Sequence, residues 1–174
     1  MLIETEETYH PNVRNFYFGT EMLAKGVAEY ADRTTQNASE LAQNILEIGG
    51  ICRVLILPDM IYVQKENEAD FAMLEPQIMA EIVEFDFSKY ADFDFSKQDK
   101  NAQIEALVEA KIRPFLKSDG GDMEILSFKN GVLNVRLQGR CKGCPHADET
   151  LKKRVEAILK NYLPDVLCVQ GEKA

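Results

Sequence analysis

The sequence has no apolar run long enough to span a membrane, and it is short of positive charge. The longest apolar candidate, residues 51–63, is broken by Arg53 and Asp59, so we expect no membrane span. There are 20 Lys and Arg against 29 Asp and Glu, a net charge of −9, which argues against nucleic acid as the main partner. The residues that follow Met1 form neither a basic stretch nor an apolar signal region. We therefore expect no export signal or organellar presequence on the chain as given.

Cysteine and histidine are also scarce, with four and two residues respectively. In the absence of a secretory signal, such cysteines indicate a reducing compartment and metal or redox chemistry. We expect a cytoplasmic protein, or a mitochondrial matrix protein if the chain is a processed eukaryotic form. Cys141 and Cys144 form a Cys-x-x-Cys pair, whereas Cys52 and Cys168 stand alone in predicted strands and are expected to be buried structural thiols. No paired carboxylates or nucleophile constellation accompany the pair, so we predict a binding protein and not an enzyme.

The composition predicts a globular chain whose two halves differ in charge. Hydrophobic residues make up 45% of the chain and charged residues 28%. Residues 1–100 carry 8 basic and 19 acidic side chains, a net charge of −11, whereas residues 101–174 carry 12 and 10, a net charge of +2. This asymmetry indicates two domains with different surfaces.

A local duplication marks the boundary between these halves. The pentapeptide Phe-Asp-Phe-Ser-Lys occurs at residues 85–89 and again at residues 93–97. We interpret residues 86–99 as a linker between a domain of residues 1–85 and a domain of residues 100–174. The duplicated segment is either a spacer or a stretch whose phenylalanines dock on a domain or a partner.

Apolar periodicity predicts the secondary structure of both halves. In the first half the expected strands are residues 2–8, 15–18, 26–30, 51–57 and 60–64, and the expected helices are residues 40–48 and 71–85. In the second half the expected helices are residues 104–116 and 147–162, and the expected strands are residues 122–128, 132–137 and 166–169. The dipeptide Asn130-Gly131 predicts a hairpin turn, and Pro114 predicts an irregular helix end. We therefore expect an α+β protein of two small domains, each a small sheet with two helices, joined by a flexible linker.

The Cys-x-x-Cys pair lies between a predicted strand and a predicted helix. Pro145 suits the first turn of that helix, which places the thiols of Cys141 and Cys144 at its N-terminus. The unpaired N–H groups and the macrodipole of a helix N-terminus favour thiolates, and Arg140 and Lys142 add positive charge. The pair is therefore suited to hold thiolate ligands.

Several kinds of site are compatible with these two thiols. A dithiol oxidoreductase of the thioredoxin type would use them directly, and two inert buried thiols would have no chemical role. A structural zinc site needs four Cys or His ligands, and one chain offers only this pair in a suitable arrangement. A 4Fe–4S cluster also needs four thiolates, which two chains would supply if each contributed Cys141 and Cys144 across a two-fold axis.

The motifs resemble those of a known family. Three segments of the second half are similar to the C-terminal NifU-like domain of Nfu proteins: residues 111–122, 139–145 and 150–152. Three segments of the first half are similar to the Nfu N-terminal domain: residues 6–8, 39–42 and 49–51. The resemblance implies an iron–sulfur cluster scaffold or carrier that binds its cluster through Cys141 and Cys144 of a homodimer. A 4Fe–4S cluster is favoured over a 2Fe–2S cluster. It also implies upstream assembly proteins and client apo-proteins as partners.

Several other polar residues could have either a structural or a functional role. His146 is either a solvent-facing residue of the first helical turn or a group at the cluster rim, and His10 is expected in a turn. Asp119 and Asp122 are expected to end a helix and not to bind a metal. The basic run 152–154 is either a solvated helix face or a docking site for acidic surfaces.

Overall fold

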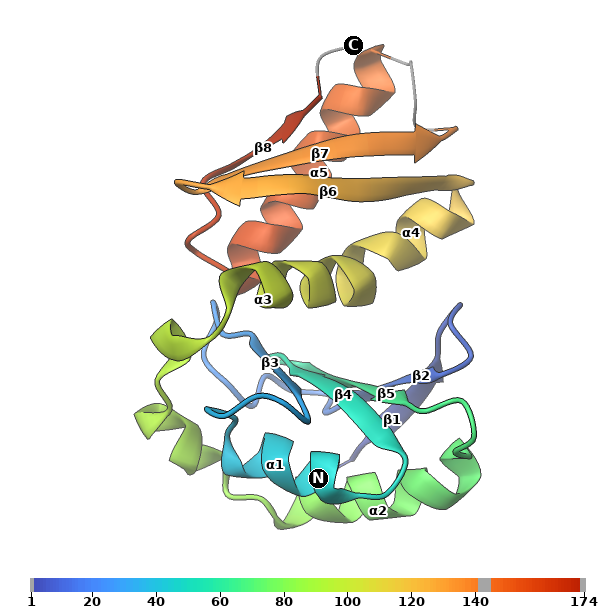
Figure 1. The fold of residues 1–174 in the computed structure, drawn as a ribbon, viewed down its shortest axis with the longest axis vertical. Coiled ribbons are helices and arrows are strands. Elements are labelled where there is room, and N and C mark those ends of the chain that lie inside the picture. Colours follow the sequence, from blue (N-terminus) through green and yellow to red (C-terminus); the bar gives the residue numbers. More distant parts are fainter. Residues whose placement is uncertain (1, 141–144, 173–174) are drawn as a thin grey trace. The chain divides into compact units, whose positions relative to one another are not determined.

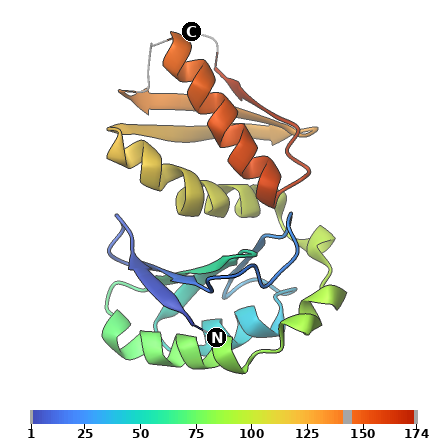
Figure 2. The ribbon, with the colours of Figure 1, turned by 180° about the vertical axis from the view of Figure 1, so that it is seen from behind.

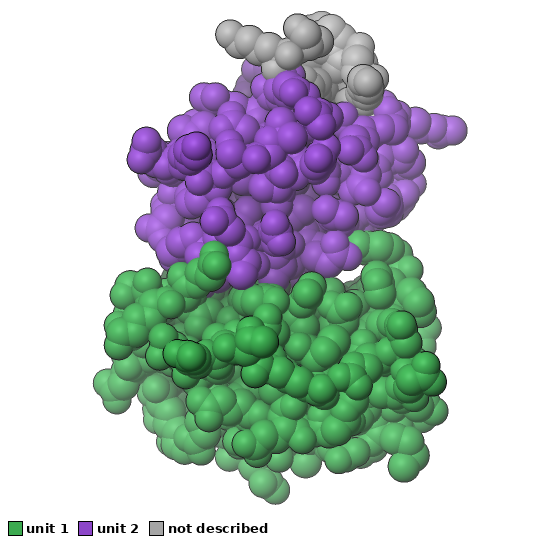
Figure 3. Space-filling model, viewed as in Figure 1, with its two compact units in different colours: residues 1–99 green, residues 100–174 purple. Residues whose placement is uncertain are grey.

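The structure is a computed structural model that describes residues 2–140 and 145–172; the side chains of residues 145–148 lie outside its description. The chain divides into two compact units, residues 1–99 and 100–174, each with its own sheet (Figures 1 and 3). This confirms the expected α+β architecture of two small domains. Each unit is described by itself below.

The first unit is an antiparallel sheet with two helices on one face (Figures 1 and 2). The strand order is β1-β2-β5-β4-β3. The elements are β1 (Glu4–Glu7), β2 (Val13–Tyr17), β3 (Glu29–Asp32), α1 (Glu40–Glu47), β4 (Ile51–Ile56), β5 (Met60–Lys65) and α2 (Phe71–Glu84). Ser39 and Asp70 cap the two helices, since their side chains accept hydrogen bonds from the second or third helical N–H.

The core of this unit lies between the helices and the facing side of the sheet. Alternate residues of the two central strands point to that side, and one helical stripe of α1 and of α2 covers them. The fully buried contributors include Leu41, Ile45, Val54, Ile61, Val63, Ile78 and Ile82. The hairpin and the helices predicted from periodicity are therefore confirmed, with helix boundaries within one residue at most ends.

The segment that we predicted as a linker is folded onto the first unit. It forms two short 3₁₀ helices, Phe87–Asp92 and Phe95–Lys97. Each copy of the duplicated pentapeptide makes the same turn, in which the side chain of Asp86 or Asp94 accepts a hydrogen bond from the serine N–H two residues later. The prediction missed this structure because 3₁₀ turns of three to six residues carry no helical or strand period.

Aromatic packing attaches this segment to the first unit, as the docking alternative predicted: its phenylalanines pack against the core, and the Phe87 ring lies 5.7 Å from the Phe18 ring, centroid to centroid. Tyr90 is buried, and its ring packs against Phe85, Phe87, Phe93 and Phe95 with centroid distances of 5.6, 6.5, 5.7 and 6.2 Å. The segment is part of the compact unit, so it differs from the flexible linker that we expected.

Gln98 fixes the end of the same segment by hydrogen bonds. Its side-chain oxygen accepts from the Tyr30 N–H at 3.1 Å, and its side-chain nitrogen donates to the Asn37 carbonyl at 3.2 Å. Gln98 itself is buried. The ordered contacts of the first unit thus extend to the residue before Asp99.

The second unit is a three-stranded mixed sheet packed against helices. The strand order is β6-β7-β8, with an antiparallel pair β6–β7 and a parallel pair β7–β8. The elements are α3 (Lys100–Leu107), a π-helical turn (Val108–Ile112), α4 (Arg113–Ser118), β6 (Gly121–Lys129), β7 (Val132–Gly139), α5 (Pro145–Tyr162) and β8 (Cys168–Gly171). The hairpin turn has positive φ at both Asn130 and Gly131, as a two-residue type I′ turn requires.

The irregular helix predicted around Pro114 is confirmed, and the irregularity has a specific form. Pro114 has no N–H and cannot donate to the carbonyl four residues earlier. The preceding residues, Val108–Ile112, adopt a π-helical turn, and α4 follows with Pro114 in its first turn. One predicted helix is therefore two α-helices joined by a π turn.

Candidate functional site

The Cys-x-x-Cys motif connects β7 to α5 (Figure 1). Cys141 and Cys144 lie outside the described residues, and so does the side chain of His146. The flanking elements are as predicted, since β7 ends at Gly139 and α5 begins at Pro145 and runs for 18 residues. The motif therefore precedes the N-terminus of a long helix, the position where thiolates are stabilised by the helix dipole.

A close backbone contact fixes the strand end that leads into the motif. Gly139 has φ +68°, and a Cβ atom there would lie 2.6 Å from the Gly120 carbonyl oxygen. Gly120 has φ +76°, and its carbonyl accepts a hydrogen bond from the Arg140 N–H at 3.3 Å. Only glycine suits the position of Gly139, so these two glycines set where the cysteine segment starts. This contact was not predicted from the sequence, although a glycine at a strand end is itself a signal of close backbone approach.

Asp122 lies in β6 and is ion-paired, so it does not end a helix as we predicted. Its carboxylate accepts a hydrogen bond from Lys117 Nζ at 2.7 Å and another from the Met123 N–H at 2.8 Å, and Arg113 lies 3.8 Å away. Partial burial disfavours the charged carboxylate, but these donors outweigh burial and lower the pKa of Asp122. Asp119 ends α4, where its N–H donates to the Phe115 carbonyl at 3.3 Å.

The basic run on α5 is used in part for packing. The Arg154 guanidinium lies over the Phe115 ring, 4.2 Å from its centroid, which joins α5 to α4. Lys153 Nζ lies 3.0 Å from Glu149 Oε1 on the same helix, and both side chains are mostly exposed. Arg154 and Lys153 thus have partners within the second unit.

The remaining two cysteines are far from the motif or in the other unit. Cys168 pairs with Val132, at the opposite end of β7 from Gly139. Seven residues of strand at about 3.3 Å each separate the two ends by roughly 23 Å. Cys52 belongs to the first unit, where its thiol donates to the Gln64 carbonyl at 3.4 Å.

Both of these thiols are half-buried and not fully buried, which corrects our prediction. For Cys52 the reason is a register shift between Ile51 and Arg53, which places Ile51 in the core and leaves Cys52 beside it. Burial raises the pKa of the Cys52 thiol. This thiol is therefore a weaker nucleophile and ligand than an ordinary one.

Among the side chains of residues 2–140 and 149–172, no three His, Cys, Asp or Glu group suitably for a metal ion. His10 is a turn residue, as predicted, since its Nδ1 accepts from the Asn12 N–H at 3.2 Å.

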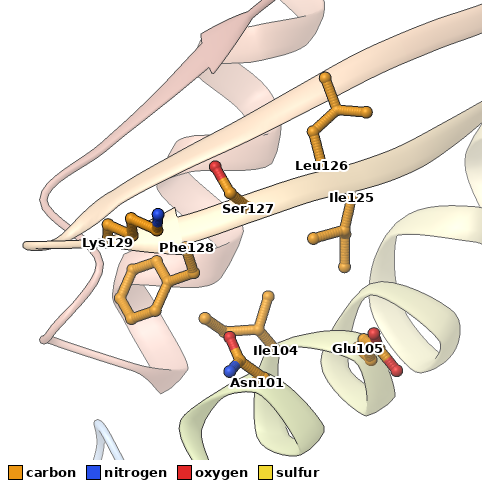
Figure 4. Close-up of a pocket in the computed structure, with 8 residues that line it drawn as sticks. All are labelled: Asn101, Ile104, Glu105, Ile125, Leu126, Ser127, Phe128 and Lys129. Carbon is orange, nitrogen blue, oxygen red and sulfur yellow. The ribbon is translucent and has the colours of Figure 1, made fainter.

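A cavity of about 410 Å³ lies between α3 and β6 (Figure 4). Its lining includes Ile104 of α3 and Ile125, Phe128 and Lys129 of β6. Lys129 is the end of β6 next to the hairpin turn, whereas Gly121, the other end, pairs with Gly139. The cavity is therefore at the end of the hairpin away from the cysteine motif and does not belong to it.

Comparison with known proteins identifies both units. Residues 3–89 match the family model described as the N-terminal domain of scaffold protein Nfu/NifU, and residues 104–170 match the model described as the NifU-like domain. The chain belongs to the Nfu family. The Cys-x-x-Cys motif lies inside the match to the NifU-like domain.

Two relatives illustrate the extent of the Nfu similarity. The chain is 30% identical over 182 residues to a Drosophila ananassae protein named NFU1 iron-sulfur cluster scaffold homolog, mitochondrial. The alignment covers 98% of this chain and 64% of that protein. It is 32% identical over 187 residues to NifU-like protein 4, mitochondrial, of Arabidopsis thaliana, in an alignment that covers 99% of this chain and 66% of that protein. The chain thus spans less than two thirds of the length of these relatives.

A solved structure also overlaps one part of the chain. Protein SAV1430 of Staphylococcus aureus aligns over 47% of this chain and 99% of its own, with 20% identity and a TM-score of 0.40. Within the described residues, none of the helices combines the length and apolar character that crossing a bilayer requires.

Proposed function

We propose that this chain is an iron–sulfur cluster scaffold and carrier. In this proposal Cys141 and Cys144 of two protomers together bind one 4Fe–4S cluster, which is then transferred to client apo-proteins. The observation that carries the proposal is the position of the Cys-x-x-Cys motif, in the NifU-like domain and directly before the N-terminus of α5.

The chemistry of the donor set supports a shared cluster. A 4Fe–4S cluster takes four thiolates, and each chain brings two adjacent thiols to one strand–helix connection. Cys168, on β8, pairs with Val132 at the end of β7 away from the motif and is too distant to join them, and Cys52 belongs to the first unit. A two-fold dimer would complete the set with no further residue type.

A shared site also suits a carrier. Each protomer supplies half of the ligands, so separation of the two chains would leave the cluster with two thiolates and favour its release to another protein. Arg140 and the N-terminal dipole of α5 would stabilise the negative charge of the thiolates while the cluster is bound. This role needs no catalytic residue, so we assign none.

The test is anaerobic reconstitution of the full chain with ferrous iron, sulfide and a thiol reductant. We expect a brown protein with about four irons per two chains and a dimer mass in native mass spectrometry. Cys141→Ser and Cys144→Ser should each remove the colour, whereas the matched controls Cys52→Ser and Cys168→Ser should keep it. Colourless wild-type protein that instead reduces a disulfide substrate would support a dithiol oxidoreductase and overturn the proposal.

The partners and location that we propose follow from this role. The second domain, residues 100–174, would bind the cluster, and the first, residues 1–99, would contribute to recognition of assembly proteins and clients. We place the protein in the cytoplasm, or in the mitochondrial matrix if it is a processed eukaryotic form; the fly and Arabidopsis relatives are named as mitochondrial proteins.

A further inference from the structure

The outer face of α2 is unusually apolar for a helix at a protein surface. Its inner face is buried in the core of the first unit through Leu74, Ile78 and Ile82. On the opposite side four residues without charge or hydrogen-bonding groups in their side chains are exposed, and we call them the α2 stripe: Met73, Pro76, Ala80 and Val83. Met73 is 71% exposed and Val83 is 54% exposed.

Helix geometry makes these four residues continuous. Their spacing of three, four and three residues places them on one side of a helix with 3.6 residues per turn. Ten residues at 1.5 Å each give the stripe a length of about 15 Å. Single exposed apolar residues are ordinary, but an aligned set on a helix that is also apolar inside indicates a surface that another molecule covers.

Pro76 adds a second feature to the outer face. It is an internal residue of α2, and its ring removes the N–H that would bond the Ala72 carbonyl four residues earlier. Proline at such a position normally destabilises a helix. The Ala72 carbonyl, on an exposed residue beside the α2 stripe, therefore lacks the N–H partner that a regular helix would give it.

The border of the α2 stripe is acidic. Between Lys65 and Lys89 the sequence has no Lys or Arg and several acidic residues: Glu66, Glu68, Asp70, Glu75, Glu81, Glu84 and Asp86. Some have partners within the unit: Glu66 lies 2.7 Å from Arg33 Nη1, Glu75 is bound by Arg14, and Glu81 accepts from Asn44 Nδ2 at 3.0 Å. Glu84 is exposed next to Val83 at the C-terminal end of α2.

We infer that the α2 stripe is a docking surface for a protein partner whose own apolar residues are bordered by Lys and Arg. Apolar side chains of the partner would cover Met73 and Val83, and its cations would face the acidic border and the Ala72 carbonyl. A second copy of this chain fits poorly, because a two-fold contact through α2 would place acidic borders opposite each other. The inference concerns apo-protein and does not require that the cluster proposal be correct.

The experiment uses the full apo chain and a synthetic probe. The probe is an 18-residue helical peptide with Leu on one face, Lys on the other and a single Trp; the matched peptide has Glu in place of every Lys. Because the chain contains no Trp, the peptide fluorescence reports binding without background. We expect the Lys peptide to bind with an affinity that falls as salt is added, and the Glu peptide to bind at least tenfold more weakly.

Variants place the binding on α2. The double variant Met73→Gln/Val83→Gln should weaken binding of the Lys peptide about tenfold or more, since it removes the two largest apolar side chains of the stripe. Leu167→Gln, which changes an apolar residue that is 62% exposed on the second unit, is the matched control and should leave binding unchanged. Circular dichroism of each variant checks that its helix content is that of the wild type.

Four results would overturn the inference. Equal binding of the Lys and Glu peptides would exclude the basic partner, and equal binding by the double variant and the wild type would exclude the α2 stripe. A wild-type oligomer that the double variant dissociates would make the occupant a second copy. Displaced amide resonances throughout residues 100–140 in the double variant would make the occupant the chain's own second unit.

Discussion

Replacing Tyr90 by Phe removes one hydroxyl from a buried polar cluster of the first unit. The Tyr90 hydroxyl donates to Glu29 Oε2 at 2.5 Å and lies 2.7 Å from Ser39 Oγ, while the Ser39 N–H donates to Glu29 Oε1 at 2.6 Å. Glu29 is fully buried. A buried carboxylate depends on such donors, because its charge has been taken out of water.

The magnitude depends on whether Glu29 is charged. Burial raises the pKa of Glu29 above its ordinary value, whereas the hydrogen bonds from Ser39 and Tyr90 lower it. A hydrogen bond to a charged group contributes about 1.5–3 kcal/mol and one between neutral groups about 0.5–1.5 kcal/mol. Tyr90→Phe should therefore destabilise the first unit by about 1 kcal/mol where Glu29 is protonated and by about 2 kcal/mol where it is ionised.

The pH dependence gives the sign of the effect. Because the folded pKa of Glu29 lies above its unfolded pKa, the stabilisation linked to this group is complete below the unfolded pKa and is lost as pH rises through the folded pKa. Without the Tyr90 hydroxyl, the folded pKa is higher still. The stability difference between wild type and Tyr90→Phe should thus grow as pH rises through the raised folded pKa of Glu29.

Urea denaturation followed by amide resonances of residues 2–99 measures this difference separately from the second unit. The matched control is Tyr30→Phe, in which the lost hydroxyl donates to Asp32 at 3.1 Å. Asp32 keeps its hydrogen bonds from Thr34 and Thr35, so the control should change stability by less than about 0.5 kcal/mol. Equal effects of the two substitutions, or an effect of Tyr90→Phe that does not vary with pH, would refute the role of the buried cluster.

Three further predictions follow from single residues. Gly139→Ala should destabilise the second unit by more than about 2 kcal/mol in urea denaturation, because an added Cβ has no room there and φ is positive. The control is Gly49→Ala, where an added Cβ would have no atom within 4 Å, and it should be nearly neutral. In Asp122→Asn the free energy of unfolding of the second unit should fall less at acidic pH than in the wild type, because the lowered pKa of Asp122 gives a stabilisation that is lost as pH falls through that pKa. The same fall in both proteins would show that the pairing with Lys117 contributes nothing. Cys52 should react with iodoacetamide more slowly at pH 8 than a cysteine in a short peptide, as measured by mass spectrometry, because burial raises its thiol pKa; equal rates would contradict this.

The sequence predicted the strands and helices whose apolar period is regular. The hairpin at Asn130-Gly131 and the helix capped by Ser39 carry strong local signals, and both are present. It did not predict the 3₁₀ turns after Phe87, the π turn before Arg113 or the register shift beside Cys52. All three features depend on packing or on one extra residue in a turn. Such features leave the hydrophobic pattern almost unchanged, so periodicity does not predict them.

The strand and the helix on either side of the cysteine motif were predicted from the sequence, but the tertiary contacts that hold them in place were not. Pro145 indicated the helix start correctly, and the pattern before it indicated the strand that ends at Gly139. The contact between Gly139 and Gly120 was missed, because the two glycines are 19 positions apart in the sequence and meet only when β6 pairs with β7. The pairing of Asp122 with Lys117 was also missed, because Asp122 was expected to end the helix and instead lies in β6.

The central claim, that two protomers share one cluster, is tested most directly by mixing chains. Wild-type protein and Cys141→Ser/Cys144→Ser protein of distinguishable mass are reconstituted together and separated by native mass spectrometry. The account predicts that iron is found on wild-type dimers with about four irons per two chains, and that the double variant carries none in any combination. Four irons on a single wild-type chain, or on a mixed dimer with one intact cysteine pair, would contradict it.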